Sequence, residues 1–140
     1  MSDRAQAIVA RLADAEPVSF GPLSQYRMLI GQTAMPLFTG VQSCQPGYQT
    51  PEHFHPYAEY LFILEGRAEA WLVGREDDVK TLGPGDMIAL PPQTPHVFRN
   101  PGPGELRLLG IHSNPERIVQ MVDGKDGSLV GPRRFNPAPG

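Results

Sequence analysis

The amino-acid sequence predicts an all-β fold, a single small barrel or sandwich built from short strands. The 140 residues include 15 Gly and 16 Pro without a collagen-type period, which indicates many tight turns. Between the turns lie apolar or β-branched runs of strand length. Seven such runs predict strands at residues 25–30, 37–45, 59–64, 67–73, 86–90, 96–99 and 105–112. The length suits one domain with its own core.

Two short helices are predicted outside these strands. Residues 2–15 carry apolar side chains at helical spacing, with a capping residue at Ser2 or Asp3 and Pro17 just beyond the end. After the last strand, Asn114 followed by a proline is typical of a cap and a first helical position, which predicts a helical turn through Met121.

These elements divide the chain into three parts. Residues 1–17 are predicted to form a helix that packs on the barrel, residues 18–122 to form the barrel, and residues 123–140 to form a tail rich in Gly and Pro. Two alternatives remain for the tail at this stage: a flexible segment, or one that becomes ordered only against a partner subunit.

Charge and composition disfavour several classes of protein. The net charge of −3, with Lys and Arg scattered along the chain, gives no reason to expect nucleic acid. The apolar runs have the length of strands, too short for a membrane-spanning helix, and residues 1–16 do not resemble a signal peptide. A single cysteine, Cys44, cannot form an internal disulfide and fits a reducing compartment. We therefore expect a cytoplasmic protein.

Three of the four histidines occupy two compact segments bounded by turns. His53 and His55 are two residues apart, so on a strand both rings point to one face, and Glu59 keeps the same parity. His96 begins the strand after the Pro-rich turn at 91–95 and can enter the same interior. Imidazole nitrogens with one carboxylate suit a divalent ion such as Fe²⁺, Mn²⁺, Ni²⁺, Cu²⁺ or Zn²⁺.

Both segments resemble the sequence motifs of the cupin superfamily. Residues 47–66, GYQTPEHFHPYAEYLFILEG, match the first motif, G-x5-H-x-H-x3-E-x6-G, at every fixed position. Residues 85–100 match the second, G-x5-P-x-G-x2-H-x3-N, except that Gln93 replaces the second glycine. That glycine serves a turn, so the departure concerns the shape of the turn rather than the metal site.

The resemblance implies a jelly-roll barrel of the RmlC-like type that binds one metal ion per chain. By their positions in the motifs, the ligands would be His53, His55, Glu59 and His96. The resemblance also implies a homodimer.

Further candidates for a catalytic site lie beside these ligands. Glu59 can accept a proton, and Tyr48, Tyr57 or His112 can act as a base or orient a substrate. The alternative for His112 is a partly solvated residue at a strand end, and for the tyrosines it is packing. Tyr60 has the wrong parity for the interior. Three arginines can fix a substrate carboxylate or be solvated strand charges: Arg67, Arg99 and Arg107.

Three functional hypotheses follow from the resemblance and these residues. The first is a metal-dependent oxygenase, most simply a dioxygenase with Fe²⁺, acting on a small organic molecule. The second is a lyase or isomerase that uses the ion as a Lewis acid. The third is a small-molecule-binding module without turnover. All three predict a small-molecule partner, and none predicts nucleic acid or a membrane.

Overall fold

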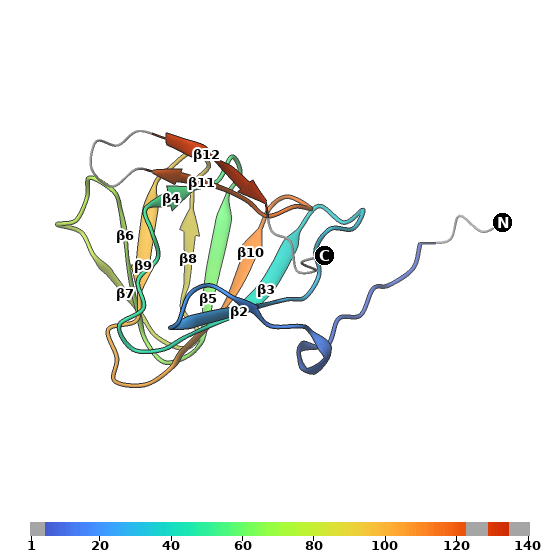
Figure 1. The fold of residues 1–140 in the computed structure, drawn as a ribbon, viewed down its shortest axis with the longest axis horizontal. Coiled ribbons are helices and arrows are strands. Elements are labelled where there is room, and N and C mark those ends of the chain that lie inside the picture. The colour runs from blue at the N-terminus through green and yellow to red at the C-terminus, as the bar shows by residue number, and fades with distance from the viewer. Residues whose placement is uncertain (1–4, 123–128, 135–140) are drawn as a thin grey trace.

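The computed structural model describes residues 5–122 and 129–134, which form a barrel of two six-stranded antiparallel sheets (Figure 1). The first sheet has the order β1-β2-β3-β10-β5-β8 and the second has the order β12-β11-β4-β9-β6-β7. The all-β fold class is confirmed. The strands are β1 Val18–Ser19, β2 Ser24–Met28, β3 Phe38–Cys44, β4 His53–Phe54, β5 Glu59–Glu65, β6 Ala68–Leu72, β7 Lys80–Leu82, β8 Met87–Leu90, β9 His96–Arg99, β10 Leu106–His112, β11 Ile118–Val122 and β12 Leu129–Arg134.

Every second residue of the central strands points inward, and these inward residues are apolar at one end of the barrel and polar at the other. On β5 the buried side chains are Glu59, Leu61 and Ile63, as the predicted parity requires. On β10 the buried run begins with Leu106 and Leu108 and ends with His112. Apolar packing therefore fills one end of the barrel, and ionisable groups gather at the other.

The turn between β5 and β6, where the chain passes from one sheet to the other, contains a residue that must be glycine. Gly66 has φ +83°, a backbone conformation that residues with a side chain rarely adopt. A Cβ atom at this position would also collide with the carbonyl oxygen of Glu105. This glycine closes the first sequence motif, and it holds β5, the strand that carries Glu59, in place.

The N-terminal helix predicted at 2–15 is wrong for the described part of that range. From residue 5 onward the model has only a 3-10 turn at Leu12–Asp14, and residues 1–4 lie outside the described residues. Ile8 and Val9 are 47% and 71% exposed, so the apolar face meets no groove on the barrel. A helix of roughly 12–15 residues is marginal in water without such packing.

The helical turn predicted after the last barrel strand is also wrong. The segment forms β11, which pairs with β4 on one side and with β12 on the other. The side-chain amide of Asn114 donates to the carbonyl of Glu116, which makes a local turn rather than a helix cap. β11 and β12 run across one end of the barrel beside β4 (Figure 1).

Five short strands were not among the seven predicted: β1, β4, β7, β11 and β12. β12 lies inside the range predicted as a tail, whereas residues 123–128 and 135–140 lie outside the described residues. Among the helical segments that the structure describes, none is long and apolar enough to cross a membrane.

Candidate metal centre

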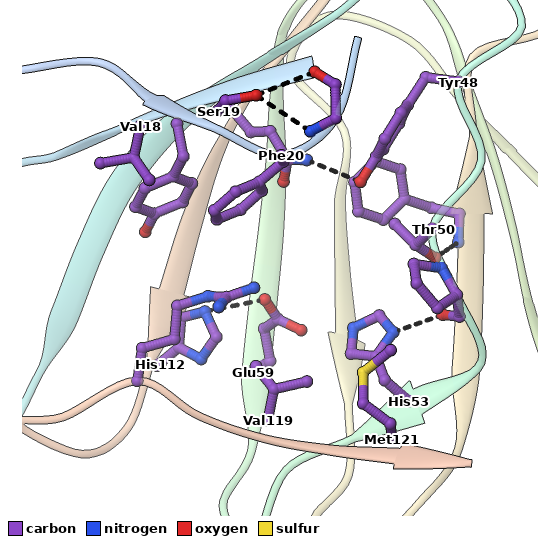
Figure 2. Close-up of a pocket in the computed structure, with 16 residues that line it drawn as sticks. Val18, Ser19, Phe20, Tyr48, Thr50, His53, Glu59, His112, Val119 and Met121 are labelled. Atoms are coloured by element: carbon purple, nitrogen blue, oxygen red, sulfur yellow. Dashed lines mark hydrogen bonds and ion pairs between the residues drawn. The ribbon is translucent and has the colours of Figure 1, made fainter. Parts of the chain in front are cut away.

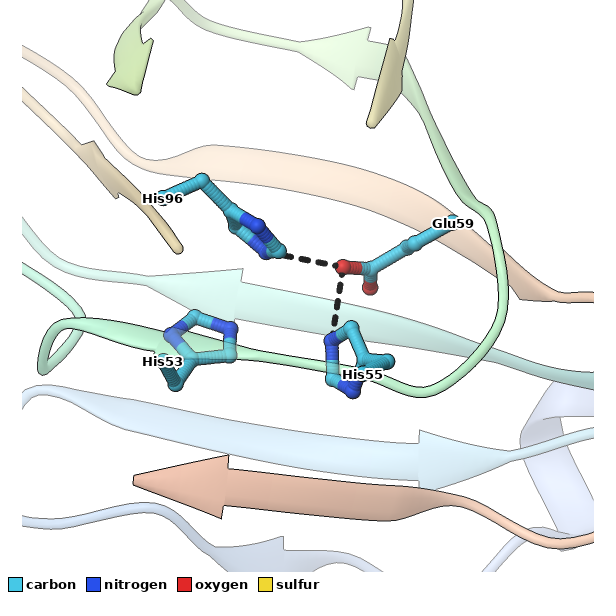
Figure 3. Close-up of side chains that lie close together, drawn as sticks. All are labelled: His53, His55, Glu59 and His96. Atoms are coloured by element: carbon cyan, nitrogen blue, oxygen red, sulfur yellow. Dashed lines mark hydrogen bonds and ion pairs between the residues drawn. The ribbon is translucent and has the colours of Figure 1, made fainter. Parts of the chain in front are cut away.

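The four predicted ligands come together at the polar end of the barrel. His53 lies on β4 and His96 begins β9, where the two residues are direct cross-strand partners. His55 follows β4, and Glu59 begins β5. One potential ligand atom from each side chain lies within 4.8 Å of the others, and all four residues are buried (Figure 3).

Each of the three imidazoles is oriented by a backbone carbonyl. Nδ1 of His53 lies 2.7 Å from the Pro51 oxygen, and Nδ1 of His96 lies 2.9 Å from the Thr94 oxygen. Nδ1 of His55 lies 2.7 Å from the oxygen of Ile118 on β11. A carbonyl only accepts hydrogen bonds, so each Nδ1 carries the proton and each Nε2 presents a lone pair toward the centre.

This arrangement concentrates electron-pair donors in a way that calls for a cation. Oε1 of Glu59 lies 3.0 Å from Nε2 of His55 and 3.3 Å from Nε2 of His96. Nε2 of His96 is buried and has no hydrogen-bond partner. With lone pairs on neutral imidazoles, these atoms would repel the carboxylate unless a positive charge lay between them. The donor set of three nitrogens and one oxygen fits a divalent metal ion.

Two pKa shifts favour the protonation states that metal binding needs. Burial lowers the pKa of His53 to about 3, and the nearby His96 acts in the same direction. Burial would raise the pKa of Glu59, but the charge of His112 and its hydrogen bond to the carboxylate bring the pKa well below its usual value. A neutral imidazole and an ionised carboxylate are therefore available near neutral pH.

Glu59 also connects the four ligands to a second group of polar residues. Its Oε2 lies 3.1 Å from Nε2 of His112, whose Nδ1 lies 2.8 Å from the hydroxyl of Tyr57. The same hydroxyl accepts from the Ile118 amide at 2.9 Å and lies 3.2 Å from the Ile118 carbonyl. One carboxylate thus contacts the candidate metal ligands with one oxygen and the His112–Tyr57 pair with the other.

His112 is 2% exposed, so its alternative as a partly solvated residue is wrong. The end of β10 is covered by Tyr57 and by the edge of Phe38, whose ring centroid lies 5.8 Å from that of His112. Burial lowers the pKa of His112, while Glu59 acts in the opposite direction.

A cavity of about 540 Å³ adjoins the cluster, within the size range of small-molecule sites. His53, Glu59 and His112 lie on one side of it, and Val18, Phe20 and Tyr48 lie on the other (Figure 2). Tyr48 therefore lines the cavity, where a residue that orients a substrate would have to lie. Tyr57 is not part of the cavity lining and contacts it only through His112. Tyr60, on the opposite parity of β5, is half-buried and does not line the cavity.

The cationic residue of the cavity is one that the sequence analysis missed. Arg117 lines the cavity, whereas Arg67, Arg99 and Arg107 do not. Arg99 instead donates to Glu69 at 2.7 Å. Arg117 and the next two cavity-lining positions, 119 and 121, recur with a period of two. This alternation is the sequence signal of a strand, and the Asn-Pro pattern before it concealed the signal.

The turn that lacks the second-motif glycine keeps the backbone conformation that glycine would favour. Gln93 has φ +59°, and its backbone N–H donates to the carbonyl of His55 at 2.8 Å. This hydrogen bond ties the second motif to the first, next to a candidate ligand. The substitution therefore leaves the turn and the cluster intact.

Sequence comparison relates the chain to two curated proteins. It is 35% identical over 79 residues to Protein SchB of Streptomyces halstedii, covering 56% of this chain and 54% of that protein. It is 35% identical over 72 residues to the uncharacterized HTH-type transcriptional regulator YobQ of Bacillus subtilis, covering 51% of this chain and 29% of that protein. The chain thus spans about half of the first relative and less than a third of the second.

Comparison with solved structures shows the same fold at low sequence identity. The polyketide cyclase RemF from Streptomyces resistomycificus has a TM-score of 0.68 at 22% identity, covering 91% of this chain and 89% of that one. An RmlC-like cupin from Shewanella frigidimarina has a TM-score of 0.67 at 20% identity, covering 80% and 94%. Oxalate decarboxylase from Bacillus subtilis, with Mn(II) centres, has a TM-score of 0.66 at 19% identity, covering 76% and 30%.

The model of the cupin domain family matches residues 40–112, more than half of the chain. The matched range contains His53, His55, Glu59 and His96, together with His112 at its end. With the two motifs, the barrel and the buried cluster, this match establishes that the chain belongs to the cupin family.

Proposed function

We propose that this cupin is a metal-dependent enzyme that moves a proton on a small planar substrate, within the lyase and isomerase class. The observation that carries the proposal is the double contact of Glu59, with the ligand cluster through Oε1 and with His112 through Oε2. The substrate site is the adjoining cavity. The fold itself does not choose the reaction, so the argument depends on these groups.

A divalent ion held by the four ligands would supply Lewis acidity toward a carbonyl or enol oxygen of the substrate. The residues around it can hold the proton that such a substrate releases. In the neutral state, Nε2–H of His112 donates to Glu59 and the Tyr57 hydroxyl donates to Nδ1. This arrangement satisfies every polar atom of the pair.

The Tyr57 hydroxyl has a second acceptor, and this gives His112 room for another proton. If the hydroxyl turns its hydrogen to the Ile118 carbonyl, 3.2 Å away, Nδ1 of His112 can carry a proton and donate to the phenol oxygen. The imidazolium that results would be stabilised by the Glu59 carboxylate at 3.1 Å. His112 can therefore store a proton without any change of backbone conformation.

The cavity walls favour a flat, partly apolar substrate. Phe20, Tyr48, Phe98, Val119 and Met121 line the space next to the ligands. Aromatic and aliphatic walls around a few polar groups are typical of sites for small organic molecules. RemF, a polyketide cyclase with the same fold over most of its length, supports a substrate of this kind.

The second candidate function is the oxygenase that the sequence analysis placed first. The donor set of three histidines and one glutamate favours it, because these ligands suit Fe²⁺. We rank it second because the Glu59–His112–Tyr57 group provides for proton transfer, which a reaction without oxygen requires. The predicted homodimer and the cytoplasmic location remain proposals.

Anaerobic and aerobic assays of the metal-loaded protein separate these functions. The protein is loaded with Zn²⁺, Mn²⁺, Ni²⁺ or Fe²⁺ and incubated in D₂O with 1,3-diketones, catechols and hydroxynaphthoates, followed by NMR. Proton exchange or isomerisation without oxygen, with several metals, is the expected result. Oxygen consumption that requires Fe²⁺ would instead support the oxygenase and contradict the proposed lyase or isomerase. Stoichiometric binding of compounds recovered unchanged would leave a binding module.

A further inference from the structure

We propose that Arg117 is the substrate anchor of this cavity and that it selects aromatic compounds bearing a carboxylate or a similar anionic oxygen group. This inference rests on the proposed function, because it takes the cavity beside the ligand cluster as the substrate site. Beyond the proposed function, the inference specifies that the substrate is anionic and that Arg117 is the residue that recognises its charge. Neither sequence motif contains Arg117, and the family match ends at residue 112.

The guanidinium of Arg117 is held in place by aromatic rings. Its Cζ lies 4.9 Å from the ring centroid of Phe20 and 5.7 Å from that of Tyr26. These two rings are themselves stacked, with centroids 5.1 Å apart. A guanidinium that lies over aromatic faces keeps the N–H donors in its plane available.

One of those donors, Nε, lacks a protein acceptor. Nε of Arg117 is buried and makes no hydrogen bond, and no carboxylate among the described residues forms an ion pair with Arg117. An unpaired buried donor on a charged group costs free energy, and it is tolerated where a ligand completes the site. By contrast, Arg99 is neutralised by Glu69 at 2.7 Å.

The balance of charge inside the cavity also favours an anion. Of the described residues that line it, Glu59 is the one carboxylate and Arg117 the one Lys or Arg. A divalent ion on the neutral imidazoles and the single carboxylate leaves an excess of positive charge, to which Arg117 adds. A ligand with a negative oxygen at each end of the cavity would balance both centres.

The influence of Arg117 extends across the cavity. Burial raises the pKa values of Tyr26 and Tyr48, whereas the charge of Arg117 acts on both in the opposite direction. His112 also lies within its electrostatic range. Arg117 lines the same cavity as two of the candidate metal ligands and the aromatic walls, so that one molecule can contact all three.

Binding of a matched pair of probes to zinc-loaded protein tests this assignment. The probes are 6-hydroxy-2-naphthoate, whose two oxygen groups lie at opposite ends of the ring system, and its neutral amide, 6-hydroxy-2-naphthamide, measured by isothermal titration calorimetry at fixed ionic strength. Wild type is expected to bind the acid at least tenfold more tightly than the amide. Arg117→Gln is expected to weaken binding of the acid at least tenfold and binding of the amide less than twofold, with unchanged zinc content.

Arg75→Gln is the matched control, because it removes the same charge from an exposed turn outside this cavity. It should bind both probes as wild type does. Arg117→Lys, which keeps the charge but loses the planar fork, should retain a preference for the acid at reduced affinity. Equal affinity of wild type for both probes would overturn the proposal, and so would unchanged binding of the acid by a folded Arg117→Gln.

This test is independent of the outcome for the proposed function. Its readout is binding, so a protein without turnover that still discriminates the acid through Arg117 keeps the anchor and loses the enzyme. Turnover that does not change in Arg117→Gln keeps the enzyme and removes the anchor.

Discussion

The cavity has two walls of different kinds. The ligand wall, with His53, Glu59 and His112, is polar, and a hydrogen bond or ion pair holds each side chain. The covering wall, with Phe20, Arg117, Val119 and Met121, comes from the segment after β1 and from the segment that leads into and forms β11. Under the proposed function, the side chains that bind the metal and those that recognise the substrate therefore come from different segments, although the backbone carbonyl of Ile118 on β11 also orients His55. Substitutions on the covering wall can change selectivity without loss of the metal ligands.

Removing a candidate metal ligand should have the largest effect. It should also show the clearest difference between variants of the ligand wall and variants of the covering wall. His53→Ala or His96→Ala is expected to abolish stoichiometric metal binding, measured by elemental analysis after dialysis. Metal at 100 times its Kd should stabilise wild type by about 2.7 kcal/mol against unfolding, and this gain should vanish in either variant. Met121→Ala, on the covering wall, should keep the metal. Equal metal content in His96→Ala and wild type would refute the ligand assignment.

Acid should weaken the ligand wall next. The pKa of His53 is about 3 in the folded protein, against 6.5 for an ordinary solvated histidine, so the unfolded chain takes up the proton first as the pH falls. Stability from this group is complete above pH 6.5 and declines below it, by about 2 kcal/mol at pH 5 in the metal-free protein. Glu59 adds a loss in the same direction below its usual pKa. Urea unfolding between pH 7 and 5 measures the change, and a flat profile would contradict it.

Removing the phenol behind His112 should have a smaller effect. Tyr57→Phe leaves the Ile118 N–H and one nitrogen of His112 without their partner, at a cost of about 1.5 kcal/mol in the free energy of unfolding. Metal content should be unchanged, while proton exchange of the substrate should slow. Tyr60→Phe, on the outward parity of β5, is the control and should change stability by less than about 0.5 kcal/mol. Equal effects of the two variants would show that Tyr57 has no special role.

The smallest effect is expected at the turn beside the ligand wall. Gln93 holds φ +59°, where glycine has no steric penalty. Gln93→Gly removes that penalty but adds freedom to the unfolded chain, so a net stabilisation of about 0.5 kcal/mol is expected, with unchanged metal affinity. Thermal unfolding and metal titration measure both. A loss of metal affinity would mean that the Gln93 side chain, and not only its backbone, supports His55.

The ligand wall could be predicted from sequence because its rules are local. Residues 53, 55 and 59 share a parity, and a strand converts parity into a shared face whatever lies around it. Gly66 and the proline-rich turn before His96 mark where those strands end. The two motifs lie far apart in the sequence, but a single antiparallel strand pairing is enough to bring their ligands together. In the structure this pairing places His53 opposite His96.

The covering wall could not be predicted, because distant pairing decides it. The segment from Asn114 has a local pattern that favours a helix, but β11 gains hydrogen bonds from β4 and β12 that a single turn of helix would lose. The burial of His112 likewise depends on Tyr57 and Glu59, which are more than 50 residues away in the chain. Arg117 was missed for the same reason.

The hydrogen bonds of the Ile118 backbone oppose any shift of β11 along its neighbouring strand. The Ile118 carbonyl accepts a hydrogen bond from the ring Nδ1–H of His55, and its own backbone N–H donates to the hydroxyl of Tyr57. If β11 slid by one residue, both groups would lose their partners and every side chain on it would exchange inside for outside. Two residues of the segment between β4 and β5 thus fix the alignment of a strand some 60 positions later, and with it the side chains that line the cavity.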